Sequence, residues 1–143
     1  MKTSVRVALP ASSERVFDYL CDLISYAELI PLVHSVVGSM SEGERVWDVE
    51  LRAKVGPFAR SKKLRMKRTV CDPHSNIVFV RDENDTREHA EWTLAVDVSP
   101  RNNGCAVEIK LAYGGRLWTA GVMERVLHDN IEEGTRRLTA KFS

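Results

Sequence analysis

The sequence lacks the short motifs by which many catalytic and metal sites are recognised. It contains no nucleophile elbow, no phosphate-cradling glycine loop and no cysteines or histidines at the spacing of metal ligands. The four histidines are scattered along the chain: His34, His74, His89 and His128. These absences lead us to expect neither a bound metal nor a cofactor.

Net charge and long apolar runs are also missing. The chain has 21 Lys and Arg against 20 Asp and Glu, and its formal net charge of +1 gives no support to a nucleic-acid partner. No apolar run reaches the length of a membrane-spanning helix. Near the start, charged residues interrupt the apolar core that a signal peptide needs: Arg6, Glu14, Arg15 and Asp18.

Cysteine is scarce, and Cys21, Cys71 and Cys105 are widely spaced. We expect three reduced, mostly buried thiols in a cytoplasmic protein, although spacing alone leaves a disulfide pair open. With 143 residues, 43% of them hydrophobic and 29% charged, the chain has the size and balance of a single globular domain over residues 1–143. Composition gives no oligomeric state.

What the sequence does contain is a succession of segments in which apolar and polar residues alternate, joined by short turns. Residues 45–55 show the pattern best, because Trp47, Val49 and Leu51 point one way while Asp48 and Glu50 point the other. We expect strands over residues 3–9, 34–40, 45–55, 62–71, 77–81, 89–98 and 105–113. Two short helices, the first capped by Ser12 or Ser13 and the second over residues 23–29, follow the first strand.

The chain closes with one long helix, expected over residues 116–142, after the pair Gly114 and Gly115. At about 100° per residue its apolar side chains fall on one stripe, and charged residues cover the opposite face. The stripe comprises Leu117, Ala120, Met123, Leu127, Ile131, Leu138 and Phe142. A long helix lying across a curved antiparallel sheet can enclose a cavity, which indicates a small-molecule carrier or an enzyme with a pocket.

Several segments resemble the START-like, or SRPBCC, superfamily, in particular its bacterial polyketide cyclase-like and carbon-monoxide-dehydrogenase-subunit-G-like branch. The resembling segments are the strand-to-helix entry 10–22, the aromatic-to-proline segment 26–31, the loop 55–58, the segment 91–94 and the final helix. The resemblance implies a helix-grip fold of the α+β class. In this fold a curved antiparallel sheet of about seven strands wraps around the C-terminal helix, and two short helices follow the first strand.

The resemblance also implies that a hydrophobic ligand, such as a lipid, quinone or polyketide, binds between the sheet and the long helix. We expect a mostly apolar pocket of roughly 300–1,000 Å³ there. Its expected lining from the sheet and its loop comprises Trp47, Val49, Leu51, Phe58, Met66, Arg68, Phe79, Trp92, Leu94, Ile109, Leu111 and Tyr113. From the final helix we expect Ala120, Met123, Glu124, Leu127, Ile131 and Gly134.

Some of these residues admit two interpretations. Alternation along their strands places Arg68 and Arg81 on the inner face of the sheet. Each side chain therefore either orients the polar end of a ligand or is carried out to solvent by a strand end or bulge. Gly134 either leaves room for the ligand or allows close packing of the helix. Glu124 and His128 lie at the edge of the apolar stripe, where they face either the pocket or water.

Three functions therefore stay open. The favoured one is a non-catalytic carrier or accessory protein that binds a hydrophobic small molecule. The second is a polyketide cyclase or dehydratase, with Arg68, Glu124 or His128 as its only plausible polar groups. The third is an accessory protein that docks on a larger complex or a membrane surface through the basic residues of the segment 60–68: Arg60, Lys62, Lys63, Arg65, Lys67 and Arg68.

Overall fold

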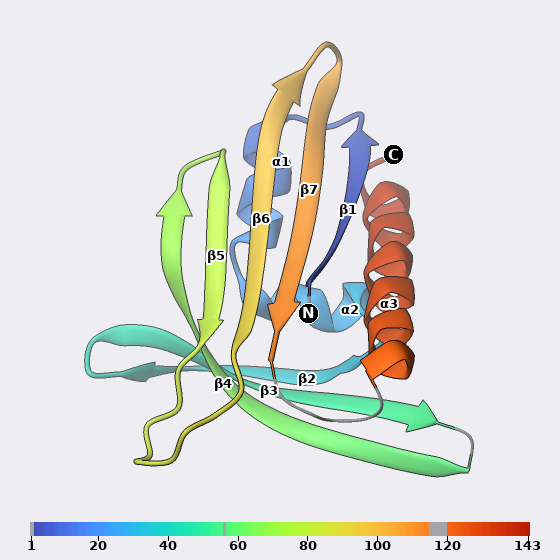
Figure 1. The fold of residues 1–143 in the computed structure, drawn as a ribbon. Coiled ribbons are helices and arrows are strands. Elements are labelled where there is room, and N and C mark those ends of the chain that lie inside the picture. Colours follow the sequence, from blue (N-terminus) through green and yellow to red (C-terminus); the bar gives the residue numbers. More distant parts are fainter. Residues whose placement is uncertain (1, 56, 115–119) are drawn as a thin grey trace.

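A computed structural model describes residues 2–55, 57–114 and 120–143, and at residues 55, 58 and 120–123 the description is confined to the backbone. Seven strands form one antiparallel sheet in the order β1-β7-β6-β5-β4-β3-β2 (Figure 1). They are β1 (Lys2–Leu9), β2 (Val33–Ser41), β3 (Glu44–Val55), β4 (Phe58–Asp72), β5 (Asn76–Arg81), β6 (Trp92–Arg101) and β7 (Gly104–Tyr113). The expected α+β helix-grip fold is confirmed.

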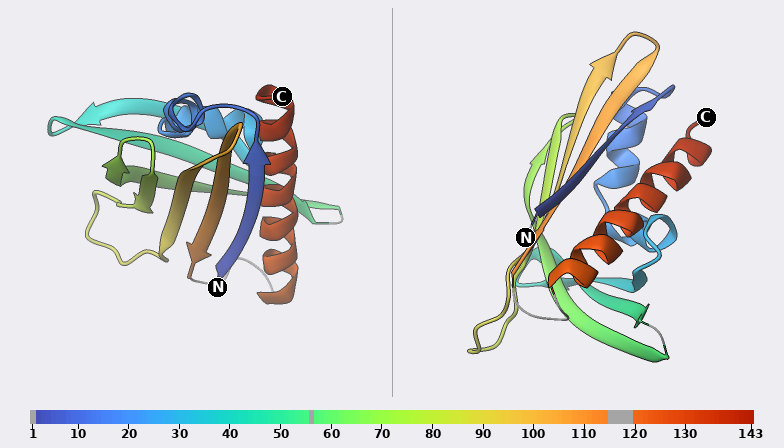
Figure 2. Two further views of the ribbon diagram at one scale, coloured as in Figure 1. Left: turned by 90° about the horizontal axis from the view of Figure 1, so that it is seen from above. Right: turned by 45° about the vertical axis from the view of Figure 1, so that its right-hand side comes forward.

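The helices lie on one face of the curved sheet (Figure 2). They are α1 (Ser13–Leu20), the single 3₁₀ turn η1 (Leu23–Ser25), α2 (Tyr26–Leu29) and the long α3 (Ala120–Lys141). The Ser12 hydroxyl caps α1 by accepting a hydrogen bond from the backbone N–H of Arg15 at 3.3 Å. Helix α1 packs on β6 and β7, α2 packs on β2, and α3 packs on β1 and α2.

Two strands differ from the sequence expectation. Strand β4 begins at Phe58 rather than residue 62, because its first residues continue the pairing with β3, as in Lys54 opposite Ala59. Strand β6 begins at Trp92 rather than residue 89. The preceding segment is held by side chains instead of a ladder: His89 bonds to Asp85, and the carbonyl of Ala90 accepts from Arg81.

An aromatic cluster fills the centre of the core. The Phe79 ring meets Trp47 edge-on, with ring centroids 5.5 Å apart, and meets Tyr26 edge-on at 5.9 Å. All three side chains are almost completely buried. Hydrogen bonds to Asp22 and to the carbonyl of Leu20 satisfy the polar atoms of Trp47 and Tyr26, so these rings form a fixed floor beneath β3 and β5.

Helix α3 contacts both the first strand of the sheet and the first helix. Near its middle, His128 Nδ1 lies 3.0 Å from the hydroxyl of Thr3 on β1. Near its end, Phe142 packs edge-on against Tyr19 of α1, with ring centroids 5.5 Å apart. Strand β1 therefore lies between β7 on one side and α3 on the other (Figure 1).

Candidate functional site

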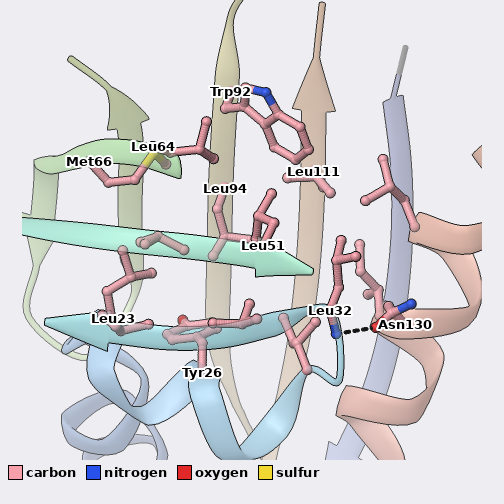
Figure 3. A pocket seen from close by; sticks show the side chains of 16 residues that line it. Leu23, Tyr26, Leu32, Leu51, Leu64, Met66, Trp92, Leu94, Leu111 and Asn130 are labelled. Atoms are coloured by element: carbon pink, nitrogen blue, oxygen red, sulfur yellow. Dashed lines mark hydrogen bonds between the residues drawn. The ribbon is translucent and has the colours of Figure 1, made fainter. Parts of the chain in front are cut away.

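An apolar cavity lies between the sheet, the segment from η1 to β2, and α3 (Figure 3). The side chains that line it are Leu23, Tyr26, Ile30, Leu32, Val33, Val36, Val49, Leu51, Leu64, Met66, Trp92, Leu94, Leu111, Leu127, Asn130 and Ile131. Each long element contributes through its own periodicity. Alternate residues of β3, β4 and β6 face the cavity, and α3 contributes residues one turn apart, Leu127 and Ile131.

The cavity is smaller than the sequence predicts. Its volume within the described part of the chain is about 70 Å³, well below the expected range. An engineered apolar cavity of about 150 Å³ holds one benzene. The expected volume was wrong because Trp47 and Phe79, assigned to the pocket walls, pack against Tyr26 and fill the space instead. A larger ligand therefore requires lining side chains to move, and Met66 is the most adaptable of them.

Few polar atoms reach the cavity, and most of them are already bonded. The Asn130 carboxamide accepts from the backbone N–H of Leu32 at 2.6 Å and donates to the carbonyl of Val126 at 2.8 Å. The Tyr26 hydroxyl donates to the carbonyl of Leu20 at 2.8 Å, and burial raises its pKa well above the usual range. A cavity with such walls favours hydrocarbon over water.

The indole N–H of Trp92 differs from these bonded groups. Trp92 lines the cavity at the start of β6 and is only 3% exposed, yet its N–H has no acceptor among the described residues. Its ring lies tilted against Tyr113, with centroids 5.2 Å apart. A buried donor without an acceptor is costly, but this nitrogen is closed off from the cavity, whose accessible wall is apolar.

The predicted site residues divide into three groups. Those that line the cavity are Val49, Leu51, Met66, Trp92, Leu94, Leu111, Leu127 and Ile131. Trp47, Arg68, Phe79, Ile109, Tyr113, Glu124 and Gly134 do not line it. The side chains of Phe58, Ala120 and Met123 lie outside the described part of the structure.

The prediction that Arg68 faces the pocket is wrong. Its side chain is exposed and donates a hydrogen bond to the carbonyl of Cys21, at the end of α1, with a distance of 2.6 Å. The guanidinium also lies 5.8 Å from the centre of the Trp47 ring. The pairing still places Arg68 opposite the buried Phe79, and the register of β4 with β5 shifts directly after it. Its long side chain reaches the carbonyl at the end of α1 and caps that helix instead of meeting a ligand.

Three predicted positions on α3 also correct the expectation. Glu124 is exposed, and His128 forms an ion pair with Glu132 at 3.2 Å besides its contact with Thr3, so neither side chain lines the cavity. Gly134 is buried against α2, where an added Cβ would lie 3.4 Å from a side-chain carbon of Ile30. This glycine therefore serves helix packing rather than ligand space.

Arg81 is a buried arginine whose partners lie within the protein. Its side chain is 8% exposed and donates to Glu83 at 2.9 Å and to the carbonyl of Ala90 at 3.2 Å. It also lies 3.2 Å from Nδ1 of His89, whose Nε2 contacts Asp85 at 2.8 Å. The charge of Arg81 is thus offset internally, as a buried guanidinium requires.

The basic residues of the segment 60–68 do not form one outer stripe. Lys63, Arg65 and Lys67 lie on the outer face of β4, where Lys67 pairs with Asp82 at 3.0 Å. Lys62 lies on the inner face, because it stands opposite Leu51, a residue that lines the cavity. The strand therefore presents positive charge on both sides of the sheet.

Sequence reasoning missed the lining residues of the segment from η1 to β2, one residue of β4 and the polar residue on α3: Leu23, Tyr26, Ile30, Leu32, Val33, Val36, Leu64 and Asn130. The signal for Leu64 was present, since it shares the phase of Met66. The segment from Leu23 to Val33 contains only single turns of helix, so no periodicity marks the face that it buries.

Among the described residues no group of His, Cys, Asp or Glu side chains is arranged to hold a metal ion. The described helices include none that is long and apolar enough to cross a membrane. Cys21, Cys71 and Cys105 are all unpaired, as expected from their spacing, but Cys71 is exposed where a buried thiol was expected.

The fold occurs in solved structures of low sequence identity. The protein TTHA0849 from Thermus thermophilus is 17% identical, with a TM-score of 0.71 over 99% of this chain and 97% of that one. A START superfamily protein from Mycobacterium smegmatis is 11% identical, with a TM-score of 0.70 over 99% and 96% of the two chains. At these low sequence identities, the structural similarity shows a shared fold and nothing more.

A further similar structure is the di-domain ARO/CYC StfQ from the steffimycin biosynthetic pathway. It is 18% identical, with a TM-score of 0.70 over 97% of this chain, which spans only 49% of StfQ. The family model for polyketide cyclase / dehydrase and lipid transport matches residues 1–143. No curated protein matches the sequence.

Proposed function

Because the chain belongs to the polyketide cyclase/dehydrase and lipid transport family, we propose that it binds an apolar small molecule in the cavity between the sheet and α3. One observation carries the proposal: almost the entire lining is aliphatic or aromatic, and it is contributed by the sheet, the short helices and α3 together. Such a lining gives affinity through burial of apolar surface, at about 25 cal/mol per Å² removed from water.

The arrangement of polar groups favours binding over catalysis. Acid–base catalysis needs convergent polar groups inside the pocket. Among the residues that line the described cavity, Tyr26 is the only titratable one, and its hydroxyl and the Asn130 carboxamide are already hydrogen-bonded to the backbone. The groups first considered for a cyclase, Arg68, Glu124 and His128, lie outside the cavity. We therefore assign the chain a carrier or accessory role in which the ligand is bound without being changed.

A pair of neighbouring valines on β2 provides the test. Val36 lines the cavity, whereas Val37 is 61% exposed on the opposite face. Phenylalanine at position 36 fills much of the free volume, and phenylalanine at position 37 adds bulk to the surface only. We expect Val36→Phe to weaken binding of an apolar fluorescent probe at least tenfold, and Val37→Phe to leave it unchanged.

The measurement is a fluorescence titration, combined with native mass spectrometry of the purified protein to detect a retained ligand. Thermal unfolding of both variants verifies that the fold is intact. Equal probe affinity in Val36→Phe and the parent protein would place the binding surface elsewhere and refute the proposal. Turnover of a bound polyketide-like compound into a cyclised product would instead favour the cyclase alternative.

A further inference from the structure

Lys62 is a basic residue near the cavity whose charge the described structure leaves unbalanced. Its side chain is half-buried, and no carboxylate of the described residues lies within ion-pair distance of its ammonium group. By contrast, the nearby cations Lys67 and Arg81 are paired with Asp82 and Glu83. An unpaired ammonium that is partly removed from water raises the question of what it binds.

The register of the sheet places Lys62 beside the cavity. Directly opposite residues of an antiparallel pair point to the same face, with their Cβ atoms about 5 Å apart. Lys62 stands opposite Leu51, and Leu64, two residues further along β4, also points inward. Both leucines line the cavity, so the stem of Lys62 continues its apolar wall and its ammonium lies beyond it.

Arg81 belongs to the same side of the site. It stands opposite Met66, another cavity-lining residue, and its guanidinium is held between Glu83 and the carbonyl of Ala90. Burial lowers the pKa of Lys62, the charge of Arg81 lowers it further, and Glu83 partly opposes both effects. Because Arg81 and Glu83 neutralise each other, the local surplus is the single positive charge of Lys62.

Trp92 belongs to the same side of the cavity. Leu64, Met66 and Trp92 lie together there, away from Leu23 and Tyr26 (Figure 3). The indole N–H of Trp92 has no acceptor among the described residues, but it is buried and not open to the cavity. Since Arg81 is paired with Glu83, the half-buried Lys62 is the charged group on this side that is available to the head group of a ligand.

We propose that the ligand is an amphipathic monocarboxylate whose hydrocarbon part fills the cavity and whose carboxylate pairs with Lys62. This inference rests on the proposed function and specifies the chemical class of the ligand. A carboxylate supplies the missing negative charge and accepts hydrogen bonds from the ammonium group. A neutral lipid or a hydrocarbon leaves the charge of Lys62 unbalanced.

Octanoate and octan-1-ol are suitable probes, because they share a chain length and differ in the head group. We expect the parent protein to bind octanoate at least tenfold more tightly than octan-1-ol in calorimetric titrations. Lys62→Met should remove this preference while leaving octan-1-ol binding unchanged. Its melting temperature should not fall, since a half-buried unpaired charge is replaced by an apolar side chain of similar length.

Lys63→Met is the matched control, because Lys63 is the next residue and points to the outer face. It should retain the preference for octanoate. Lys62→Arg should retain it as well, because the positive charge is kept, and Lys62→Gln repeats the test if Lys62→Met does not fold.

The possible outcomes separate this inference from the proposed function. Equal affinity for octanoate and octan-1-ol overturns the carboxylate assignment and leaves the apolar cavity site standing. Equal losses in Lys62→Met and Lys63→Met also overturn it, because they indicate a general effect of surface charge. Binding of neither probe, together with no binding of an apolar fluorophore, contradicts the proposed function itself.

Discussion

The backbone N–H of Leu32 donates a hydrogen bond to Oδ1 of Asn130 across a distance of 2.6 Å. This bond joins the middle of α3 to the turn between α2 and β2, and both residues line the cavity. Since Asn130 is further fixed by its bond to Val126, the spacing between the two walls is set by one side chain. The two cavity walls that contain Leu32 and Asn130 are therefore held together by hydrogen bonds as well as by packing.

Replacing Asn130 with leucine should destabilise the fold although the new side chain is apolar. The buried N–H of Leu32 loses its acceptor, which costs about 1–3 kcal/mol. We expect a corresponding fall in the free energy of unfolding, measured by urea denaturation. An Asn130→Leu variant as stable as the parent protein would contradict this role.

Asp22 connects the helical segment to the sheet, and a second prediction concerns its carboxylate. Its Oδ1 accepts from the indole N–H of Trp47 at 3.1 Å and from the backbone N–H of Ile24 at 3.0 Å. Asp22→Ala leaves a fully buried indole donor unbonded, so we expect a loss of about 1–3 kcal/mol in chemical denaturation. Asp22→Asn preserves an acceptor oxygen at the same place. If both variants lost the same stability, the charge and not the hydrogen bonding of Asp22 would be the cause.

Gly134 provides a graded test of the packing between α3 and α2. Its Cβ position lies at ordinary contact distance from Ile30, 3.4 Å, and from the carbonyl oxygen of Leu29, 3.6 Å. Gly134→Ala should therefore be tolerated and gain up to about 1 kcal/mol from helix propensity. Gly134→Leu should lose about 1–3 kcal/mol through overpacking. Thermal unfolding measures both variants. A leucine variant as stable as the alanine variant would mean that this position faces free space in the cavity.

The three cysteines should react with alkylating agents in a fixed order. Cys71 is exposed and should react first, while Cys105 is 1% exposed and should react only when the chain unfolds. Burial raises the pKa of Cys21 and Cys105, so their thiolates form at higher pH in the folded protein than in the unfolded chain. Mass spectrometry after timed exposure to iodoacetamide at several pH values measures the order.

The same shifts predict how stability depends on pH. A thiol whose pKa is raised by folding stabilises the folded state below the pKa of the unfolded chain, about 8.5. Above that value the unfolded thiols release their protons first, so the free energy of unfolding should decrease as the pH rises. Replacing Cys105 with alanine should reduce this decrease. An unchanged pH dependence in Cys105→Ala would mean that other groups cause it.

The fold was predictable from sequence because most strands are buried on one face and solvated on the other. That asymmetry produces an alternation of apolar and polar residues in the sequence, as in residues Trp47 to Leu51. The apolar stripe of α3 can be recognised in the sequence for the same reason. The cavity was less predictable, because alternation gives the face of a residue and not its depth. Trp47 and Leu51 share a phase, yet the first lies in the aromatic floor and the second in the cavity wall.

Residue type misled the interpretation at two positions of β4. Arg68 has the inward phase, but a local irregularity and the end of α1 provide it with a different partner. Lys62 has the same phase as Leu64 but was grouped with the other basic residues of the segment 60–68 as a docking surface. Periodicity gave the correct face of the sheet for Lys62. It could not give the partner of Arg68, because that partner lies at the end of the neighbouring helix α1.

The position of β1 between β7 and α3 has a consequence for how the chain acquires its structure. The contacts that hold this strand reach far along the sequence: Arg6 bonds to Glu108, 102 residues away, and Thr3 contacts His128, 125 residues away. Strand β1 is therefore synthesised well before its partners β7 and α3 and cannot pair until they are made. Folding dominated by such distant contacts is slow, and the partly assembled sheet exposes an open edge in the meantime. We infer that the pairing of β1 with β7 completes the sheet, that α3 then packs against β1, and that the nascent chain is most prone to aggregation just before these steps.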